Sequence, residues 1–311
     1  MQWIKKGIIF VPDNNELFMK SHAAIPFADK IENDILRIYF SSRNDKGQSM
    51  PFYIDAKMNG QFLKVLHIEK KPIFNLGSLG SFDDNGIMPS CVVNYMNMKY
   101  LYYIGWNPQV TVSYRLSIGL AISDDGGNNF KKYSIGPICD RNIHEPFFNT
   151  APYVILENNL WRMWYVSCTG WRKINNYPEP SYHIKYAESM DGINWKKRGV
   201  ICIDYDHFAE AIGRPCIIFE NGIYKMWYSY RSITNYRIDR EKSYRLGYAA
   251  SVDGLNWNRK DNEVGIEKSE DGWDSEMIEY CHIVNINGLK YMFYNGNGFG
   301  KTGFGYAVSK E

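Results

Sequence analysis

The stretch IKYAESMDGINWKKRG, Ile184 to Gly199, decides the fold because the chain repeats it. A related copy, LSIGLAISDDGGNNFKKY (116–133), precedes it, and a second, YRLGYAASVDGLNWNRKD (244–261), follows it. The chain ends on FGYAVSKE (304–311), which contains the first half of the same pattern and lacks the Asp-Gly-x-x-Trp half. A sequence that repeats at this length is typical of solenoids and propellers.

Two residue types mark the register of the repeat, each recurring every 63 residues. The prolines are Pro26, Pro89, Pro152 and Pro215, and the tyrosines are Tyr39, Tyr102, Tyr165 and Tyr228. A fifth unit follows, with Tyr280 in the proline position and Tyr294 in the tyrosine position. The chain therefore consists of five related units.

Each unit is predicted to form four short strands. Three segments rich in β-branched and aromatic residues precede an Asp-Gly or Asn-Gly turn, and a fourth opens on Trp or Phe. Such turns accept the positive φ of tight hairpins. Four antiparallel strands repeated around an axis define an all-β, five-bladed β-propeller. We expect a single domain, 1–311, with blades at about 20–67, 83–136, 145–201, 208–261, and 274–309 plus 1–10.

The incomplete fifth unit predicts how the ring closes. MQWIKKGIIF (1–10) is similar to INWKKRGVIC (193–202), with Trp3 in the position of Trp195. The N-terminal segment would therefore supply the outer strand of the last blade, beside residues 302–309. This closure protects a strand edge that would otherwise be open to other chains.

Composition excludes several classes of function. The net charge is +2 with both signs interspersed, which gives no support for nucleic-acid binding. No apolar segment has the length of a membrane span or the pattern of a secretion signal, so we expect a cytoplasmic protein without a membrane partner. The six cysteines contain no C-x-x-C pair. Cys91, Cys216 and Cys281 are expected to be buried, reduced thiols. We predict no metal site and no cofactor.

The five-fold pattern resembles the five-bladed propeller glycosidases. It combines x-Pro-x inner strands, Trp/Tyr-Tyr second strands and Ser-x-Asp-Gly-x-x-Trp turns over essentially the whole chain. The fold is shared by glycoside hydrolase families 32, 43, 62, 68, 117 and 130. The turns are also similar to the Asp-box of sialidases, so Asp124, Asp191 and Asp253 are expected to be structural.

The resemblance implies a substrate site over the central funnel, where inner strands begin and second strands end. Polar and aromatic residues suited to binding a sugar occur at both places. Near the beginnings of inner strands we predict His22, Asp84, Asn149, Arg214 and Glu276 as substrate-binding residues. At the ends of second strands we predict Arg43, Trp106, Trp171, Arg231, Asn295 and Asn297.

Glycoside hydrolysis generally needs an acid and a second carboxylate. The candidates are Glu210 as the acid, with Glu279 or Glu145 as its partner. In the similar families an aspartate precedes the first-blade proline, whereas this chain has Ile25. The family's three acidic residues therefore do not transfer position by position.

Three functions remain open on the sequence. The first is a glycosidase acting on an oligosaccharide or sugar conjugate, including an intermediate of polysaccharide biosynthesis. The second is a phosphorylase resembling family 130, with phosphate held by Arg43, Arg231, Arg214 and His22, because guanidinium groups suit phosphate. The third is a propeller that binds a glycan without chemistry. The oligomeric state is left open.

Two long segments, GWRKINNYPEPSYH (170–183) and RSITNYRIDREKSYR (231–245), interrupt the tight hairpins of the third and fourth blades. Loops longer than a connection needs usually carry function or disorder. We expect them to form the walls of the substrate pocket, through Tyr177, Tyr182, Tyr236 and Arg237.

Overall fold

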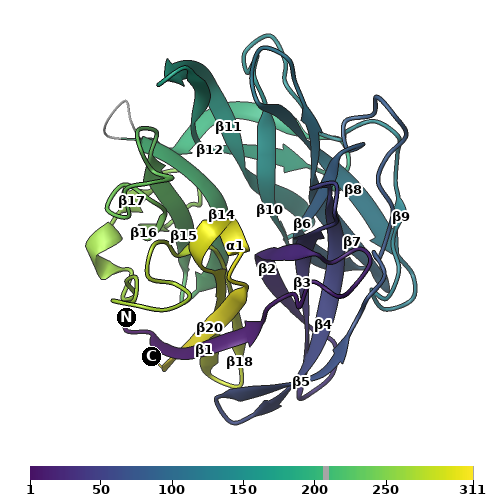
Figure 1. Cartoon of the computed structure of the whole chain (residues 1–311), viewed down its shortest axis with the longest axis vertical. Coiled ribbons are helices and arrows are strands. Elements are labelled where there is room, and N and C mark those ends of the chain that lie inside the picture. Colours follow the sequence, from purple (N-terminus) through teal and green to yellow (C-terminus); the bar gives the residue numbers. More distant parts are fainter. Residues whose placement is uncertain (206–209, 311) are drawn as a thin grey trace.

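The repeats fold as four-stranded antiparallel sheets. The structure, a computed structural model, describes residues 1–205 and 210–310 of the chain. Within these residues, five such sheets lie around a common centre (Figure 1). A single parallel pairing, Ser49 with Gly86, joins the first and second sheets into one of eight strands.

The sheets follow one another along the chain. The first contains β2 (Ser21–Lys30), β3 (Ile35–Arg43), β4 (Ser49–Asn59) and β5 (Phe62–Ile68). The second contains β6 (Gly86–Tyr95), β7 (Met98–Pro108), β8 (Tyr114–Ser123) and β9 (Lys131–Lys132). The third contains β10 (Asn149–Glu157), β11 (Leu160–Ile174), β12 (Tyr177–Ser189) and β13 (Lys196–Ile203). The fourth contains β14 (Glu210–Glu220), β15 (Ile223–Ser232), β16 (Arg245–Ser251) and β17 (Asn258–Arg259). The fifth contains β18 (Glu279–Ile286), β19 (Leu289–Asn295), β20 (Phe304–Lys310) and β1 (Ile4–Phe10).

Helical structure is limited to short turns in the part of the chain that the structure describes. The 3-10 turn η1 (Asp261–Glu263) follows β17, and α1 (Asn297–Gly300) follows β19. None of the described helices has the length and apolar character needed to cross a membrane.

The N-terminal strand completes the fifth sheet, which confirms the expected closure. β1 runs antiparallel to β20, with Ile4 opposite Val308 and Phe10 opposite Phe304 (Figure 1). The Trp3 side chain is 6 % exposed and meets Trp227 of the fourth sheet edge-on, with ring centroids 6.3 Å apart. The two ends of the chain therefore share one sheet, and Trp3 also fixes that sheet to its neighbour.

The Ser-x-Asp-Gly turns are structural, as expected. In the turn of the third sheet, the Ser189 hydroxyl donates to the Asp191 carboxylate over 2.8 Å, and that carboxylate accepts the backbone N–H groups of Ile193 and Asn194. The turn of the fourth sheet repeats these bonds around Asp253. In the second sheet, the prediction that Asp124 is the structural aspartate of the turn is wrong by one residue. Asp125 makes these bonds there, because it stands two residues after the turn serine, as Asp191 and Asp253 do.

The turns also connect neighbouring sheets. An aromatic donor on the second strand of one sheet bonds to a glycine carbonyl in the next sheet's turn. The pairs are Tyr39 with Gly127 (3.1 Å), Tyr102 with Gly192 (2.8 Å) and Trp164 with Gly254 (2.8 Å). Tyr291 of the fifth sheet bonds likewise to Gly60 of the first. Gly192 has φ +73, and a Cβ atom there would lie 2.8 Å from the Tyr102 hydroxyl, so the contact requires glycine.

The inner strands share a backbone irregularity that corrects the register of the fifth unit. Ile25, Ala151 and Arg214, each directly before a proline, have φ of 55°, 46° and 55° at a break in strand pairing. Tyr280 has φ 56° at the equivalent break. Tyr280 therefore takes the position before the proline, and the expectation that it replaces the proline is wrong by one residue. Left-handed backbone at non-glycine residues costs free energy and often marks functional sites.

We expect Trp3→Ala to lower the free energy of unfolding by about 3–5 kcal/mol, because it leaves a cavity against Trp227 at the closing sheet. Urea denaturation of the purified chain measures this effect. Ile4→Ala is the matched control, since Ile4 is 59 % exposed and its loss should cost roughly 0.5 kcal/mol or less. Equal effects of the two substitutions would contradict closure through Trp3.

Candidate functional site

Glu279 opens β18 at the end of the ring where inner strands begin. Its side chain is fully buried. Asn295, directly opposite on β19, donates its Nδ2 to Glu279 Oε1 over 2.7 Å. The Asn295 Oδ1 accepts the backbone N–H of Ile25 over 3.1 Å, which ties this pair to the first sheet. Glu279 Oε2 has no hydrogen-bond partner among the described residues.

Burial sets the protonation state of Glu279. It raises the pKa of this carboxyl to about 8, although the Asn295 amide and the positive charges of Arg231 and Arg43 favour the ionised form. At neutral pH the group is therefore mostly a carboxylic acid with a proton to donate. A carboxyl of this kind, enclosed at a strand end beside cations, is typical of functional sites.

Arg231 lies at the end of β15, next to Glu279. The guanidinium is 2 % exposed and its central carbon lies 3.7 Å from the centre of the Tyr236 ring. It donates to the Tyr244 hydroxyl over 3.1 Å and to the Ser232 carbonyl over 2.9 Å. No carboxylate forms an ion pair with Arg231 within the described ranges, so aromatic faces and neutral oxygens provide its contacts.

Arg43 and His22 lie at the matching place in the first sheet, where Ser21 pairs with Arg43 across β2 and β3. Burial, together with the nearby charges of Arg43 and Lys301, lowers the pKa of His22 to about 4. The imidazole is therefore neutral at physiological pH, and its Nδ1 lies 2.9 Å from the Ser21 hydroxyl. Charge effects thus link four of the predicted residues, Glu279 with Arg231 and Arg43, and Arg43 with His22, and Asn295 bonds to Glu279.

Glu145 lies in a different environment. Its carboxylate accepts the Tyr165 hydroxyl over 2.9 Å and the Asn149 amide over 2.7 Å. Lys185 and Lys197 approach it to 3.4 Å each. Burial favours the neutral acid, but these cations and donors hold the pKa of Glu145 below its usual value. These four partners of the Glu145 carboxylate all belong to strands of the third sheet.

The same arrangement recurs in three other sheets. A carboxylate accepts the hydroxyl of a second-strand tyrosine and pairs with a basic residue of the outermost strand or the segment beside it. The sets are Asp83 with Tyr103 and Lys132, Asp261 with Tyr228 and Arg259, and Asp274 with Tyr294 and Lys5. Because Glu145 and its partner Asn149 belong to this repeated set, a structural role accounts for both. The sequence contained a signal for this repeated set, because in three units the carboxylate residue precedes its tyrosine by a similar number of residues along the chain.

Other residues that were predicted to bind substrate form hydrogen bonds to the backbone of loops. Asn297 accepts the backbone N–H groups of Glu276 and Met277, while the Glu276 side chain is exposed. Asp84 accepts the backbone N–H of Gly80. None of these contacts involves Glu279.

The two predicted tryptophans contact protein groups at strand ends. Trp106 covers Gly86, where a Cβ atom would lie 2.8 Å from its ring. The Trp171 ring meets Tyr114 and Phe148 edge-on, at 5.3 and 5.9 Å between ring centroids.

The predicted acid Glu210 begins β14 opposite Ser232, but its side chain lies outside the described residues.

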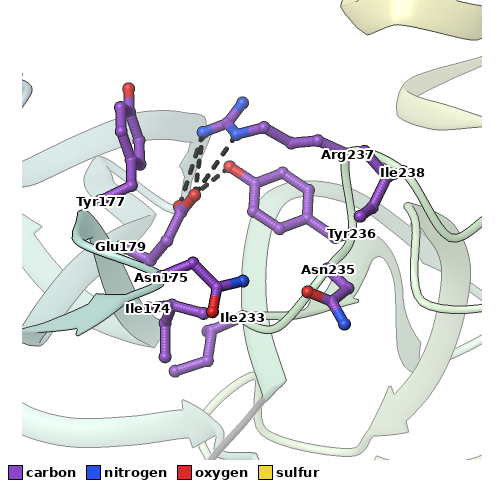
Figure 2. Close-up of a pocket in the computed structure, with 9 residues that line it drawn as sticks. All are labelled: Ile174, Asn175, Tyr177, Glu179, Ile233, Asn235, Tyr236, Arg237 and Ile238. Carbon is purple, nitrogen blue, oxygen red and sulfur yellow. Dashed lines mark hydrogen bonds and ion pairs between the residues drawn. The ribbon is translucent and has the colours of Figure 1, made fainter.

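The two long segments form one cavity, as expected. A pocket with a volume of about 410 Å³ lies between them, and Figure 2 shows the residues that line it. It is lined by Ile174, Asn175, Tyr177, Glu179, Ile233, Asn235, Tyr236, Arg237 and Ile238. The first segment differs from the expected loop. It extends β11 and β12 as a hairpin, because Asn175 and Asn176 adopt the positive φ of a tight turn, at 49° and 64°.

Glu179 organises this pocket, and sequence reasoning did not single it out. Its buried carboxylate accepts the Tyr236 hydroxyl over 3.0 Å and pairs with Arg237 at 3.3 Å (Figure 2). The Arg237 guanidinium lies 4.5 Å from the Tyr236 ring centre. Since Arg231 contacts the same ring, Tyr236 connects the pocket to the group around Glu279. Tyr182, which was also predicted to line the pocket, lies deeper, with its hydroxyl 2.7 Å from the Tyr244 hydroxyl.

Several solved structures with this fold are named as glycosidases or glycoside hydrolases. A putative glycosidase from Bacteroides thetaiotaomicron superposes with a TM-score of 0.70 at 17 % identity, covering 98 % of this chain and 96 % of that one. A GH43_1 enzyme from Xanthomonas citri complexed with xylose gives 0.59 at 15 %, covering 94 % and 88 %. At these identities the similarity shows the fold, which is that of the propeller-type glycosidases.

Sequence relatives place the chain in a family. It is 38 % identical to the uncharacterized protein MT1551 of Mycobacterium tuberculosis (strain CDC 1551 / Oshkosh) over 99 % of both chains, and it belongs to the same family. A 1,2-beta-oligomannan phosphorylase from Thermoanaerobacter sp. is 33 % identical over 88 residues, or 28 % of this chain and 29 % of that protein. No established family model matches the chain.

We expect Glu279→Gln to reduce the dependence of stability on pH. With a native pKa of about 8 against 4.5 for the free side chain, the folded chain binds more protons than the unfolded chain between these values. The contribution of Glu279 to wild-type stability should therefore fall as pH rises from 5 to 8.5. A variant with a neutral amide lacks this loss, so wild-type Tm should fall by roughly 5 °C or more beyond that of the variant.

Thermal denaturation at fixed ionic strength measures the two pH profiles. Glu276→Gln removes an exposed carboxylate from the same segment and should leave the wild-type profile unchanged. Parallel profiles for wild type and Glu279→Gln would contradict a raised pKa.

Proposed function

We propose that the chain is a single-domain, five-bladed β-propeller that cleaves a glycosidic bond in an oligosaccharide or sugar conjugate. The five four-stranded sheets correspond to the blades, and the glycoside hydrolase neighbours support a carbohydrate substrate. Buried, reduced cysteines favour a cytoplasmic location, and an intermediate of polysaccharide biosynthesis would suit an enzyme placed there.

The observation that carries the proposal is a fully buried carboxyl, whose pKa burial raises, near two guanidinium groups. Glu279 is the proton donor, while Arg231 and Arg43 supply positive charge next to it. The tyrosines around Arg231 and the Glu179 pocket offer aromatic faces and hydroxyls, the groups that bind sugar rings. Because the Glu279 side chain is buried in the free chain, substrate must displace side chains at the end of the ring where inner strands begin in order to reach Oε2.

The balance of charges favours phosphorolysis. Hydrolysis needs a second carboxylate to activate water, whereas the described groups next to Glu279 are cations and neutral donors. A phosphate oxygen would bond to the anomeric carbon as the glycosidic C–O bond breaks, and the Glu279 proton would pass to the leaving oxygen. The products are a sugar 1-phosphate and the shortened glycan. Dihydrogen phosphate or water then returns a proton to Glu279. The local similarity to a 1,2-beta-oligomannan phosphorylase supports this choice.

Hydrolysis is the second candidate, with Glu210 as the other carboxylate. Its place at the start of β14, in the sheet next to Glu279, supports this pairing. A glycan-binding propeller without chemistry is the third candidate, and the isoleucine in the position of the first-blade aspartate favours it.

We expect phosphate-dependent release of sugar 1-phosphate from a member of a manno-, gluco- and galacto-oligosaccharide panel, incubated with the wild-type chain. Glu279→Gln should lower kcat/KM by about 10²–10⁴-fold, the usual value of a general acid. Activity should fall above pH 8 as Glu279 ionises. Arg43→Met should mainly raise the KM for phosphate, because it removes one cation and leaves the acid.

Phosphate-free turnover that Glu210→Gln abolishes would establish hydrolysis instead. Failure of every sugar to turn over, with one of them still raising Tm, would establish binding alone. Glu145→Gln is the informative control, since a structural Glu145 predicts a lower Tm with catalytic activity per folded molecule retained.

A further inference from the structure

Arg214 is a buried charge without a partner. It lies on β14, the inner strand of the fourth sheet, and its side chain is 1 % exposed. None of its three guanidinium nitrogens has a hydrogen-bond partner among the described residues. Other buried arginines of this chain are bonded. Arg162, for example, donates to Tyr186, Glu157 and Tyr224.

The groups around Arg214 come from its own strand and from three other inner strands, and they are neutral. The charge of Arg214 acts on the thiols of Cys91, Cys216 and Cys281 and on the Tyr153 hydroxyl, which lie on β6, β14, β18 and β10. Burial raises the pKa of each of these groups, to about 12 for Cys91. Burial also lowers the pKa of nearby His282 to about 3. The guanidinium is therefore the charged member of this cluster.

The cluster offers hydrogen-bond donors. Arginine presents five N–H groups, and neutral thiol and phenol groups add S–H and O–H. His282 Nδ1 accepts the backbone N–H of Ala28 over 3.2 Å, so its hydrogen is on Nε2, which is also a donor. A buried cation without a counter-charge costs several kcal/mol. A site of this composition lacks an acceptor that carries negative charge.

We infer that Arg214 binds a monovalent anion of halide size at the centre of the ring. One negative charge balances the guanidinium, and the enclosure by inner strands favours a small ion. The bound anion would join strands of the second, third, fourth and fifth sheets through one contact point. The Arg214 site is separate from the candidate site around Glu279, because the charges that act on Glu279 are those of Arg231 and Arg43. The inference does not depend on the proposed enzymatic activity.

The test compares thermal denaturation in potassium chloride and potassium gluconate at equal ionic strength, on protein prepared without halide. Wild-type Tm should rise with the logarithm of chloride concentration. Arg214→Met should lose this dependence and, without halide, should be at least as stable as wild type, because it removes an uncompensated charge. Arg162→Met is the matched control: it also removes a buried guanidinium, but one that has partners, and should keep the chloride dependence.

Crystals of the wild-type chain grown in bromide provide a test that needs no variant. We expect an anomalous peak within hydrogen-bond distance of the Arg214 guanidinium. No peak there, together with equal Tm in chloride and gluconate, would overturn the inference. Stabilisation by phosphate or sulfate alone, lost in Arg214→Met, would overturn the assignment to a halide-size ion.

Discussion

Closure of the sheet ring is the constraint on which the rest of this structure depends. Each four-stranded sheet has apolar faces that only its two neighbouring sheets can cover. A gap in the ring would therefore leave the apolar faces of two sheets exposed. The chain meets this requirement by bonding an aromatic donor of one sheet to a turn glycine of the next, as Tyr102 does with Gly192. At the closing sheet, β1 pairs with β20 and Trp3 packs on Trp227, which joins the two ends of the chain.

Closure also determines where charge can be placed. The inner strands converge, so their side chains lie in surroundings that water does not reach. There, burial raises the pKa of Glu279, and Arg214 has no hydrogen-bond partner among the described residues. The Glu145 carboxylate, by contrast, pairs with Lys185 and Lys197 of the two outer strands. The position of a charged residue across the sheet thus separates structural carboxylates from the candidate functional ones.

Part of the candidate site was within reach of the sequence. The beginnings of inner strands and the ends of second strands predicted His22, Arg43, Arg231 and Glu279, on which the proposed site is built, because these strand ends meet at one end of the ring. Glu145 satisfied the same rule but belongs to the repeated set of tyrosine–carboxylate contacts. The one-residue error at Tyr280 arose at a bulge that periodic spacing does not anticipate, and the error at Asp124 arose because two adjacent aspartates follow Ser123 and the second makes the turn bonds.

The sequence by itself determined the repeat, the four strands of each unit and the closing strand, because strand periodicity, turn residues and the 63-residue spacing are local properties. Only the tertiary structure determined the protonation of buried side chains and the contacts between side chains from different segments. The raised pKa of Glu279 depends on burial by residues from several strands, and the contacts of Glu179 with Tyr236 and Arg237 depend on the two long segments meeting. Desolvation and contact between distant segments are properties of the assembled ring, and no short stretch of sequence carries them.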